Sequence, residues 1–258
     1  MIAAIAGDIV GSVHERANLK RMNFALFQQN SRFTDDTVMT LAVADCILHR
    51  KPYAETMRVY GRRYPDRGYG GMFRTWLAND DAGPYNSFGN GSAMRVSPIG
   101  YALDKRKDVM TEAQRSAEVT HNHPEGIKGA QAIALAVFLA RKDAGKDELR
   151  REIEKTFGYD LHRHIKQIRK SYTFDVSCQG SVPEAIIAFL DSEGVEDAIR
   201  LGVSLGGDAD TIACMAGAIA QAHYKQVPAI LVDKVKSVLT PELWALTQEF
   251  SEHYKIAY

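Results

Sequence analysis

Two short acidic runs, far apart in the sequence, hold the residue types that bind divalent cations. One is Thr34-Asp35-Asp36-Thr37, and the other is Gly206-Gly207-Asp208-Ala209-Asp210-Thr211. Each run places two carboxylates beside threonine hydroxyls, and oxygen ligands of this kind suit Mg²⁺, Mn²⁺ or Ca²⁺. If folding brings the runs together, their four carboxylates can neutralise two such cations. That is the composition of a two-metal hydrolytic site.

Helix capping is the alternative explanation for both runs, because Asp and Thr are common N-cap residues and an apolar, helix-like segment follows each run. A cap, however, needs only one acceptor. Each run supplies two carboxylates, and like charges at one turn disfavour joint ionisation. The N-terminus of a helix relieves only part of this repulsion. We therefore favour cation binding over capping alone.

Two glycine-containing segments are predicted to be loops that contact a substrate. Residues Gly7 to Glu15 contain two glycines, which permit close backbone approach, and end in an acidic residue that can reach a cleft. In Gly89-Asn90-Gly91-Ser92, the glycines favour positive φ angles, which let several N–H groups converge on an anion. A plain turn is the alternative for this second segment.

Two histidines, His121 and His123, precede Pro124 at the expected start of a helix. The N-terminus of a helix favours a bound phosphate, so we expect both histidines to contact a ligand there. Zinc is a less suitable occupant, since neither a cysteine partner nor an HExxH motif accompanies the pair.

Helical patterns dominate the chain, and strand patterns are nearly absent. A 3.6-residue apolar period, proline at helix starts and capping residues predict helices over 36–48, 125–141, 160–172, 185–190 and from 241 onward. No linker, repeat or low-complexity segment divides the chain. The sequence therefore predicts an all-α fold formed by a single domain over residues 1–258.

Composition excludes several classes of protein. Lys plus Arg and Asp plus Glu both total 32, and this balance argues against nucleic-acid or anionic-membrane partners. Cys46, Cys178 and Cys214 show no CxxC spacing, which suits a reducing compartment and indicates neither zinc nor a disulfide framework. The apolar N-terminus lacks the basic region of a signal peptide, and no apolar run reaches the ~20 residues of a membrane span. We expect a cytoplasmic protein.

Taken in order, the motifs resemble those of the ADP-ribosylglycohydrolase family, which includes the dinitrogenase reductase activating glycohydrolases. They are Gly7-Asp8…Glu15, Phe33-Thr34-Asp35-Asp36-Thr37, Gly89-Asn90-Gly91-Ser92-Ala93-Met94-Arg95, Thr120-His121…His123-Pro124 and Gly206-Gly207-Asp208-Ala209-Asp210-Thr211. The resemblance implies a compact orthogonal helical bundle with a binuclear Mg²⁺ or Mn²⁺ centre. It also implies hydrolysis of the glycosidic bond between ADP-ribose and a modified protein side chain or a small conjugate.

The resemblance also implies roles for individual residues. The metal ligands are expected to be Thr34, Asp35, Asp36, Asp208, Asp210 and Thr211, and the residues that hold ADP-ribose are expected to be Gly89, Asn90, Gly91, Ser92 and His121, with His123 beside them. Asp36 or Asp210 would orient the attacking water or take its proton. Glu15 is the alternative base, or else orients the ribose.

Two other functions are compatible with these residues. A two-metal site can hydrolyse phosphate esters or phosphoanhydrides, in which case phosphate or AMP is released rather than ADP-ribose. A protein that binds ADP-ribose without catalysis is the other alternative, and the intact set of four aspartates in the two runs speaks against it.

Overall fold

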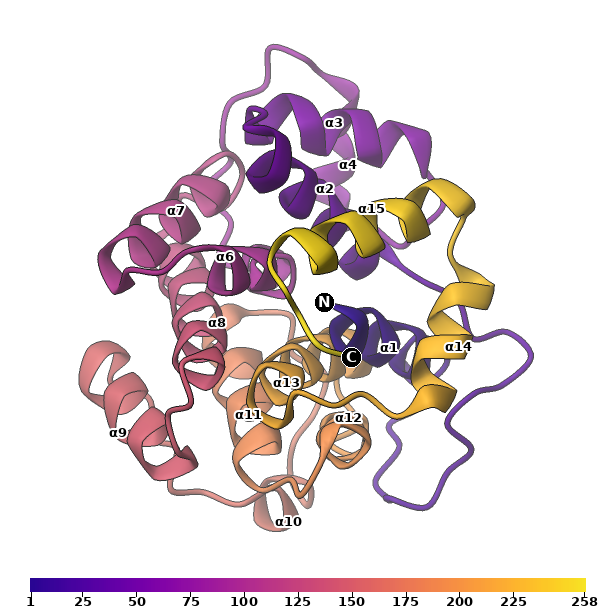
Figure 1. Cartoon of the computed structure of the whole chain (residues 1–258), viewed down its shortest axis with the longest axis vertical. Coiled ribbons are helices and arrows are strands. Elements are labelled where there is room, and N and C mark those ends of the chain that lie inside the picture. The colour runs from indigo at the N-terminus through magenta and orange to yellow at the C-terminus, as the bar shows by residue number, and fades with distance from the viewer.

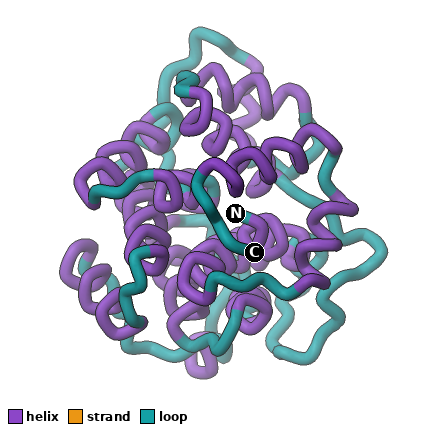
Figure 2. The backbone as a smooth tube through the Cα atoms, in the orientation of Figure 1, coloured by secondary structure: helices purple, strands orange, loops and turns teal.

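Fifteen α-helices and their connections form the chain in the computed structural model, which describes all residues from 1 to 258 (Figures 1 and 2). In chain order they are α1 (Ile2–Gly11), α2 (Asp35–His49), α3 (Tyr53–Arg63), α4 (Gly71–Ala78), α5 (Gly91–Met94), α6 (Ser97–Ala102), α7 (Arg106–Glu118), α8 (Pro124–Arg141), α9 (Lys146–Phe157), α10 (Ile165–Ile168), α11 (Cys178–Leu190), α12 (Val195–Val203), α13 (Ala209–Tyr224), α14 (Ala229–Val238) and α15 (Pro241–His253). The only β-type pairing is an isolated bridge between Gly89 and Ser177. The predicted all-α fold is confirmed. None of the helices has the length and apolar character required to cross a membrane.

The centre of the molecule is a close antiparallel pair of helices, α1 and α13 (Figure 1). Every residue of α1 is buried, as are all residues of α13 before its last two. Small residues allow this approach: a Cβ atom on Gly7 would lie 2.2 Å from the carbonyl oxygen of Ala213, and one on Gly217 would lie 2.4 Å from that of Ala3. Helices α8, α11 and α12 pack around α13. Helix α13, rich in alanine and glycine, is therefore at the centre of the fold.

The antiparallel pairing brings the two acidic runs into one region. Because α1 and α13 run in opposite directions, the C-terminal end of α1 lies beside the N-terminal end of α13. Gly11 marks this point, since a Cβ there would lie 2.3 Å from the Cα of Asp210. Helix α2 begins at Asp35, so both runs stand at helix N-termini, as expected. The ends of three helices thus meet at one place.

Other helix predictions are partly confirmed. Helices α8 and α15 begin at Pro124 and Pro241 as predicted, and the hydroxyl of Thr240 accepts a hydrogen bond from the N–H of Leu243 (3.3 Å). The prediction for residues 160–172 is wrong, because only Ile165–Ile168 is helical in this stretch.

The predicted start of α11 is also wrong. The helix begins at Cys178 and not near Ala185, because Ser177 supplies the N-cap, where its hydroxyl accepts from the N–H of Gly180 (3.1 Å). Ser181 and Pro183, which precede the predicted helix at 185–190, lie inside α11.

The close packing of α1 and α13 predicts an unusual response to a glycine substitution. We expect Gly217→Ala to lower the free energy of unfolding by about 1–3 kcal/mol, because the added methyl group forces the two backbones apart. Gly71→Ala is the matched control: Gly71 begins α4 with no neighbouring atom within 4 Å, so alanine there should leave stability unchanged or raise it by up to about 1 kcal/mol. Urea denaturation measures both changes, and equal stabilities of the two variants would contradict the packing argument.

Candidate active site

Three buried carboxylates converge where α1, α2 and α13 meet. Asp8, Asp36 and Asp210 each offer an oxygen atom, and these atoms all lie within 4.8 Å of one another. Each side chain is at most 4% exposed, and each comes from a different helix. A buried all-oxygen set of this kind can hold a hard divalent cation.

Asp8 is held by the N-terminus of a neighbouring helix. Its carboxylate accepts hydrogen bonds from the backbone N–H groups of Thr34 (2.9 Å) and Thr37 (3.1 Å), and from both threonine hydroxyls. Asp8, which belongs to α1, thereby pairs with N–H groups that the first turn of α2 leaves without a partner.

Asp8 is not among the ligands predicted from the sequence. The prediction of a loop at Gly7–Gly11 is wrong, because these residues are helical. One feature of the sequence points to Asp8: it is a single acidic residue inside an apolar segment, and a carboxylate buried there needs a polar partner.

Asp36 connects the two acidic runs and keeps one oxygen unpaired. Its Oδ2 accepts from the hydroxyl of Thr211 (3.2 Å) and lies at the same distance from the hydroxyl of Thr34, the N-cap of α2. Its Oδ1 is buried and has no hydrogen-bond partner. An orphaned carboxylate oxygen costs free energy unless a ligand completes it, so Oδ1 is the atom of the cluster most in need of a cation.

The cluster resists full ionisation. Burial raises the pKa of Asp8 to about 6, although hydrogen bonds from two threonines oppose this shift. Burial and then the charges of neighbouring aspartates raise the pKa of Asp36 and of Asp210 well above the usual range. Buried carboxylates that lie close together disfavour one another's ionisation, and a bound cation would relieve this repulsion.

The remaining predicted ligands flank this cluster. Asp208 is buried, and its Oδ2 accepts from the side-chain amide of Asn90 (2.7 Å). Asp35 is half-buried, and its pKa is raised by burial and by the charge of Asp8. Of the six predicted ligands, the cluster with Asp8 holds Asp36 and Asp210, whereas Thr34 and Thr211 contact it through their hydroxyls and Asp35 and Asp208 lie beside it.

Glu15 lies in the turn that follows α1, at the edge of this region, and is half-buried. Its charge adds to the burial and the aspartate charges that raise the pKa of Asp210. Its closest ion pair is a loose contact of 3.9 Å with the exposed Arg16. Glu15 is thus near the cluster without being held by it.

The segment Gly89–Ser92, called here the glycine loop although Gly91 and Ser92 begin α5, reaches the acidic cluster through Asn90 but lacks the backbone conformation expected. None of its residues has positive φ; Asn90 has a φ of −71°. Lack of space for a side chain explains why glycine occurs here, since a Cβ on Gly91 would lie 3.1 Å from Nε2 of His121. The N–H of Asn90 is also engaged, donating to the carbonyl of Val176 (2.8 Å). The hydroxyl of Ser92 donates to the carbonyl of Gly126 (2.7 Å).

The two histidines differ in their surroundings. His121 is buried, and its Nε2 edge faces the glycine loop. His123 is the N-cap of α8, where its Nδ1 accepts from the N–H of Glu125 (3.1 Å). His121 therefore turns its Nε2 edge towards the predicted site, whereas His123 uses its Nδ1 to cap α8.

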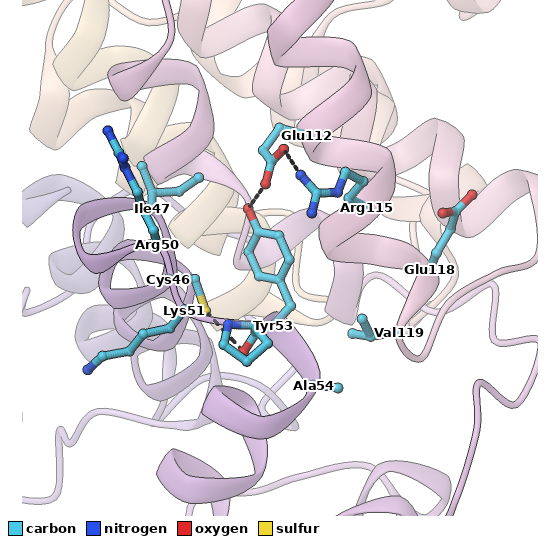
Figure 3. Close-up of a pocket in the computed structure, with 11 residues that line it drawn as sticks. Cys46, Ile47, Arg50, Lys51, Tyr53, Ala54, Glu112, Arg115, Glu118 and Val119 are labelled. Carbon is cyan, nitrogen blue, oxygen red and sulfur yellow. Dashed lines mark hydrogen bonds and ion pairs between the residues drawn. The ribbon is translucent and has the colours of Figure 1, made fainter.

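A separate surface pocket of about 610 Å³ lies at the other end of α2 (Figure 3). Its polar groups satisfy one another: the hydroxyl of Tyr53 donates to Glu112 (2.8 Å), which also pairs with Arg115 (2.9 Å). Cys46, which lines it, lies ten residues after Asp36 on the same helix, so roughly 15 Å separates the pocket from the acidic cluster. This pocket is not part of the candidate site.

Comparisons with known proteins show the family to which the chain belongs. The family model described as ADP-ribosylglycohydrolase matches residues 1–256. The chain is 29% identical to ADP-ribosylhydrolase ARH3 of Danio rerio, over 87% of this chain and 81% of that protein. It is 28% identical to ADP-ribosylarginine hydrolase Tri1 of Pseudomonas putida, over 79% of this chain and 62% of that protein. A solved structure titled as an ADP-ribosylglycohydrolase-related protein complex has the same fold, with a TM-score of 0.70 at 24% identity over 100% of this chain and 97% of its own. The chain belongs to the ADP-ribosylglycohydrolase family.

Proposed function

We propose that this protein is a divalent-metal-dependent hydrolase that cleaves the glycosidic bond between ADP-ribose and a modified protein side chain or small conjugate, with the whole chain acting as one catalytic domain. The observation that carries the proposal is the buried carboxylate cluster, in which Oδ1 of Asp36 lacks any partner. The names of the ARH3 and Tri1 relatives specify ADP-ribosyl substrates, and that of Tri1 specifies the arginine linkage.

The residues of the cluster suit a binuclear Mg²⁺ or Mn²⁺ centre. We assign as ligands the set Asp8, Thr34, Asp35, Asp36, Asp208, Asp210 and Thr211, all of which offer oxygen atoms. When bound, the cations would supply positive charge that orients ribose oxygens and makes the attacking water more acidic.

The chain's own groups then carry the remaining steps. Hydrolysis joins the water oxygen to the anomeric carbon and breaks the bond to the leaving group, whose nitrogen or oxygen keeps the bonding electrons and takes up a proton, with positive charge developing on the sugar. Asp36 or Asp210 takes the proton from the water, and Glu15, free of strong ion pairs at the edge of the site, is the alternative base or orients the ribose. Asn90 keeps Asp208 in place through its amide. The loop Gly89–Ser92 and the histidines His121 and His123 hold the ADP-ribose moiety.

Metal binding can be tested without any substrate. We expect Mg²⁺ or Mn²⁺ at 100 times its Kd to stabilise the folded protein by about 2.7 kcal/mol, because a ligand that binds only the native state adds its binding free energy. Asp36→Asn should lose this effect, yet should unfold in EDTA at the wild-type temperature or above it, since one of several like charges is gone. Asp233→Asn, at an exposed position of α14, is the control. Thermal unfolding of the three proteins is measured with Mg²⁺ and with EDTA. If Mg²⁺ stabilises Asp36→Asn as much as the wild type, Asp36 is not a metal ligand.

Turnover tests the reaction itself. With arginine-linked, serine-linked and O-acetyl-ADP-ribose substrates, we expect chromatography to show release of free ADP-ribose from at least one of them. Asp36→Ala and Asp210→Ala should lose at least about 100-fold in rate, because each removes a candidate base and a metal ligand. Asp233→Asn should keep full activity, and circular dichroism verifies that the variants are folded. Full activity in either alanine variant would refute the site, whereas release of AMP or phosphate would favour a phosphoester hydrolase.

A further inference from the structure

His121 presents one ring nitrogen to the candidate site, and the location of its proton decides what that nitrogen can do. Nε2 faces the loop at Gly89 and Gly91, where added Cβ atoms would lie 3.6 and 3.1 Å away. The hydrogen bond that the His121 ring makes within the protein uses the other nitrogen, Nδ1. A protonated Nε2 donates to an oxygen of a ligand, whereas an unprotonated Nε2 can only accept.

The other ring nitrogen ends a buried hydrogen-bonded chain. Nδ1 of His121 lies 2.7 Å from the hydroxyl oxygen of Thr120, a fully buried residue. That hydroxyl also lies 3.0 Å from Nη2 of Arg95, which donates its second hydrogen to the carbonyl of Ser116 (2.8 Å). Arg95 is itself 1% exposed, so the hydrogen bonds from Arg95 through Thr120 to His121 are shielded from water.

Counting hydrogens along this chain fixes the direction of each bond. Burial lowers the pKa of Arg95 to about 10, which still leaves the guanidinium charged at pH 7, and a charged guanidinium can only donate. The hydroxyl of Thr120 therefore accepts from Arg95, and the structure offers its single hydrogen no other acceptor than Nδ1 of His121. If Nδ1 carried a proton instead, the threonine hydrogen would be buried without a partner.

We propose that Arg95 and Thr120 are positioning residues that hold His121 in the tautomer with its proton on Nε2. The Nε2–H group then donates to an oxygen of ADP-ribose bound at the Gly89–Gly91 loop. This second part rests on the proposed function, whereas the tautomer does not. The ring also stays neutral, because burial and the charge of Arg95 lower the pKa of His121 well below the usual range.

The tautomer can be read directly by nuclear magnetic resonance. In the full chain labelled with ¹⁵N-histidine, we expect long-range ¹H–¹⁵N spectra to show a pyridine-like Nδ1 and a pyrrole-like Nε2 for His121. Loss of one signal set in His121→Gln assigns the residue among the eight histidines. Thr120→Ser, which keeps the hydroxyl, should retain this pattern, and Thr120→Val should convert it to a mixture of tautomers. A wild-type spectrum with the proton on Nδ1 would overturn the proposal.

Calorimetry with ADP-ribose and Mg²⁺ tests the consequence for binding. We expect Thr120→Val to weaken ADP-ribose binding by about 10- to 100-fold, the usual effect of losing an aligned hydrogen bond to a charged ligand, and Thr120→Ser to restore it to within about 3-fold. Thr247→Val is the matched control, because Thr247 is equally buried and its hydroxyl donates only to the carbonyl of Leu243 (2.8 Å).

Wild-type affinity in Thr120→Val would overturn the positioning role. If the wild type shows the Nε2–H tautomer but binds no ADP-ribose, the proposed function fails together with the ligand half of this proposal, and the tautomer itself stands.

Discussion

The carboxylate of Asp8 lies buried at the N-terminus of α2, where it accepts hydrogen bonds from two backbone N–H groups and two threonine hydroxyls. This contact joins α1 to α2, while the glycines of α1 place the same helix against α13. Three helix ends therefore converge, and with them the carboxylates of Asp36 and Asp210. Movement of α1 relative to either neighbour would separate the acids, so the packing of the core and the geometry of the site depend on the same contacts.

This arrangement costs stability in the absence of a counter-ion. Buried like charges and an unpaired Oδ1 on Asp36 are unfavourable features that a fold retains only where they serve a function. The surrounding structure offsets them by rigid packing, since α1 and most of α13 are buried along their length. A rigid scaffold also suits catalysis, because ligands that are already in position need no reorganisation when a substrate binds.

The positions of the acidic runs were predictable from the sequence, because each run combines cap-forming residues with the start of an apolar helical period. The order of the motifs also sufficed to predict the family and the all-α fold. The role of Asp8 was harder to predict: its partners lie 26 and 29 residues away, and Gly7 and Gly11 suggested a loop where they instead permit helix contact.

The errors over α11 and over residues 160–172 have different origins. Ser177 and Ser181 are both capable caps, and amphipathic spacing alone does not form a helix when tertiary contacts favour an extended segment. The glycines of the loop at residues 89–92 reflect crowding by His121 and not backbone handedness. At this loop the deciding contact is distant in sequence, whereas the start of α11 is set by the local Ser177 cap.

The central claim is that the buried carboxylates and the glycine loop form one metal-dependent site for ADP-ribose. Isothermal titration calorimetry of the wild-type protein with ADP-ribose, first with Mg²⁺ and then with EDTA, tests this claim most directly. We expect binding in the micromolar range with Mg²⁺ and a large loss of affinity in EDTA. Absence of binding under both conditions, or equal affinity in both, would contradict it.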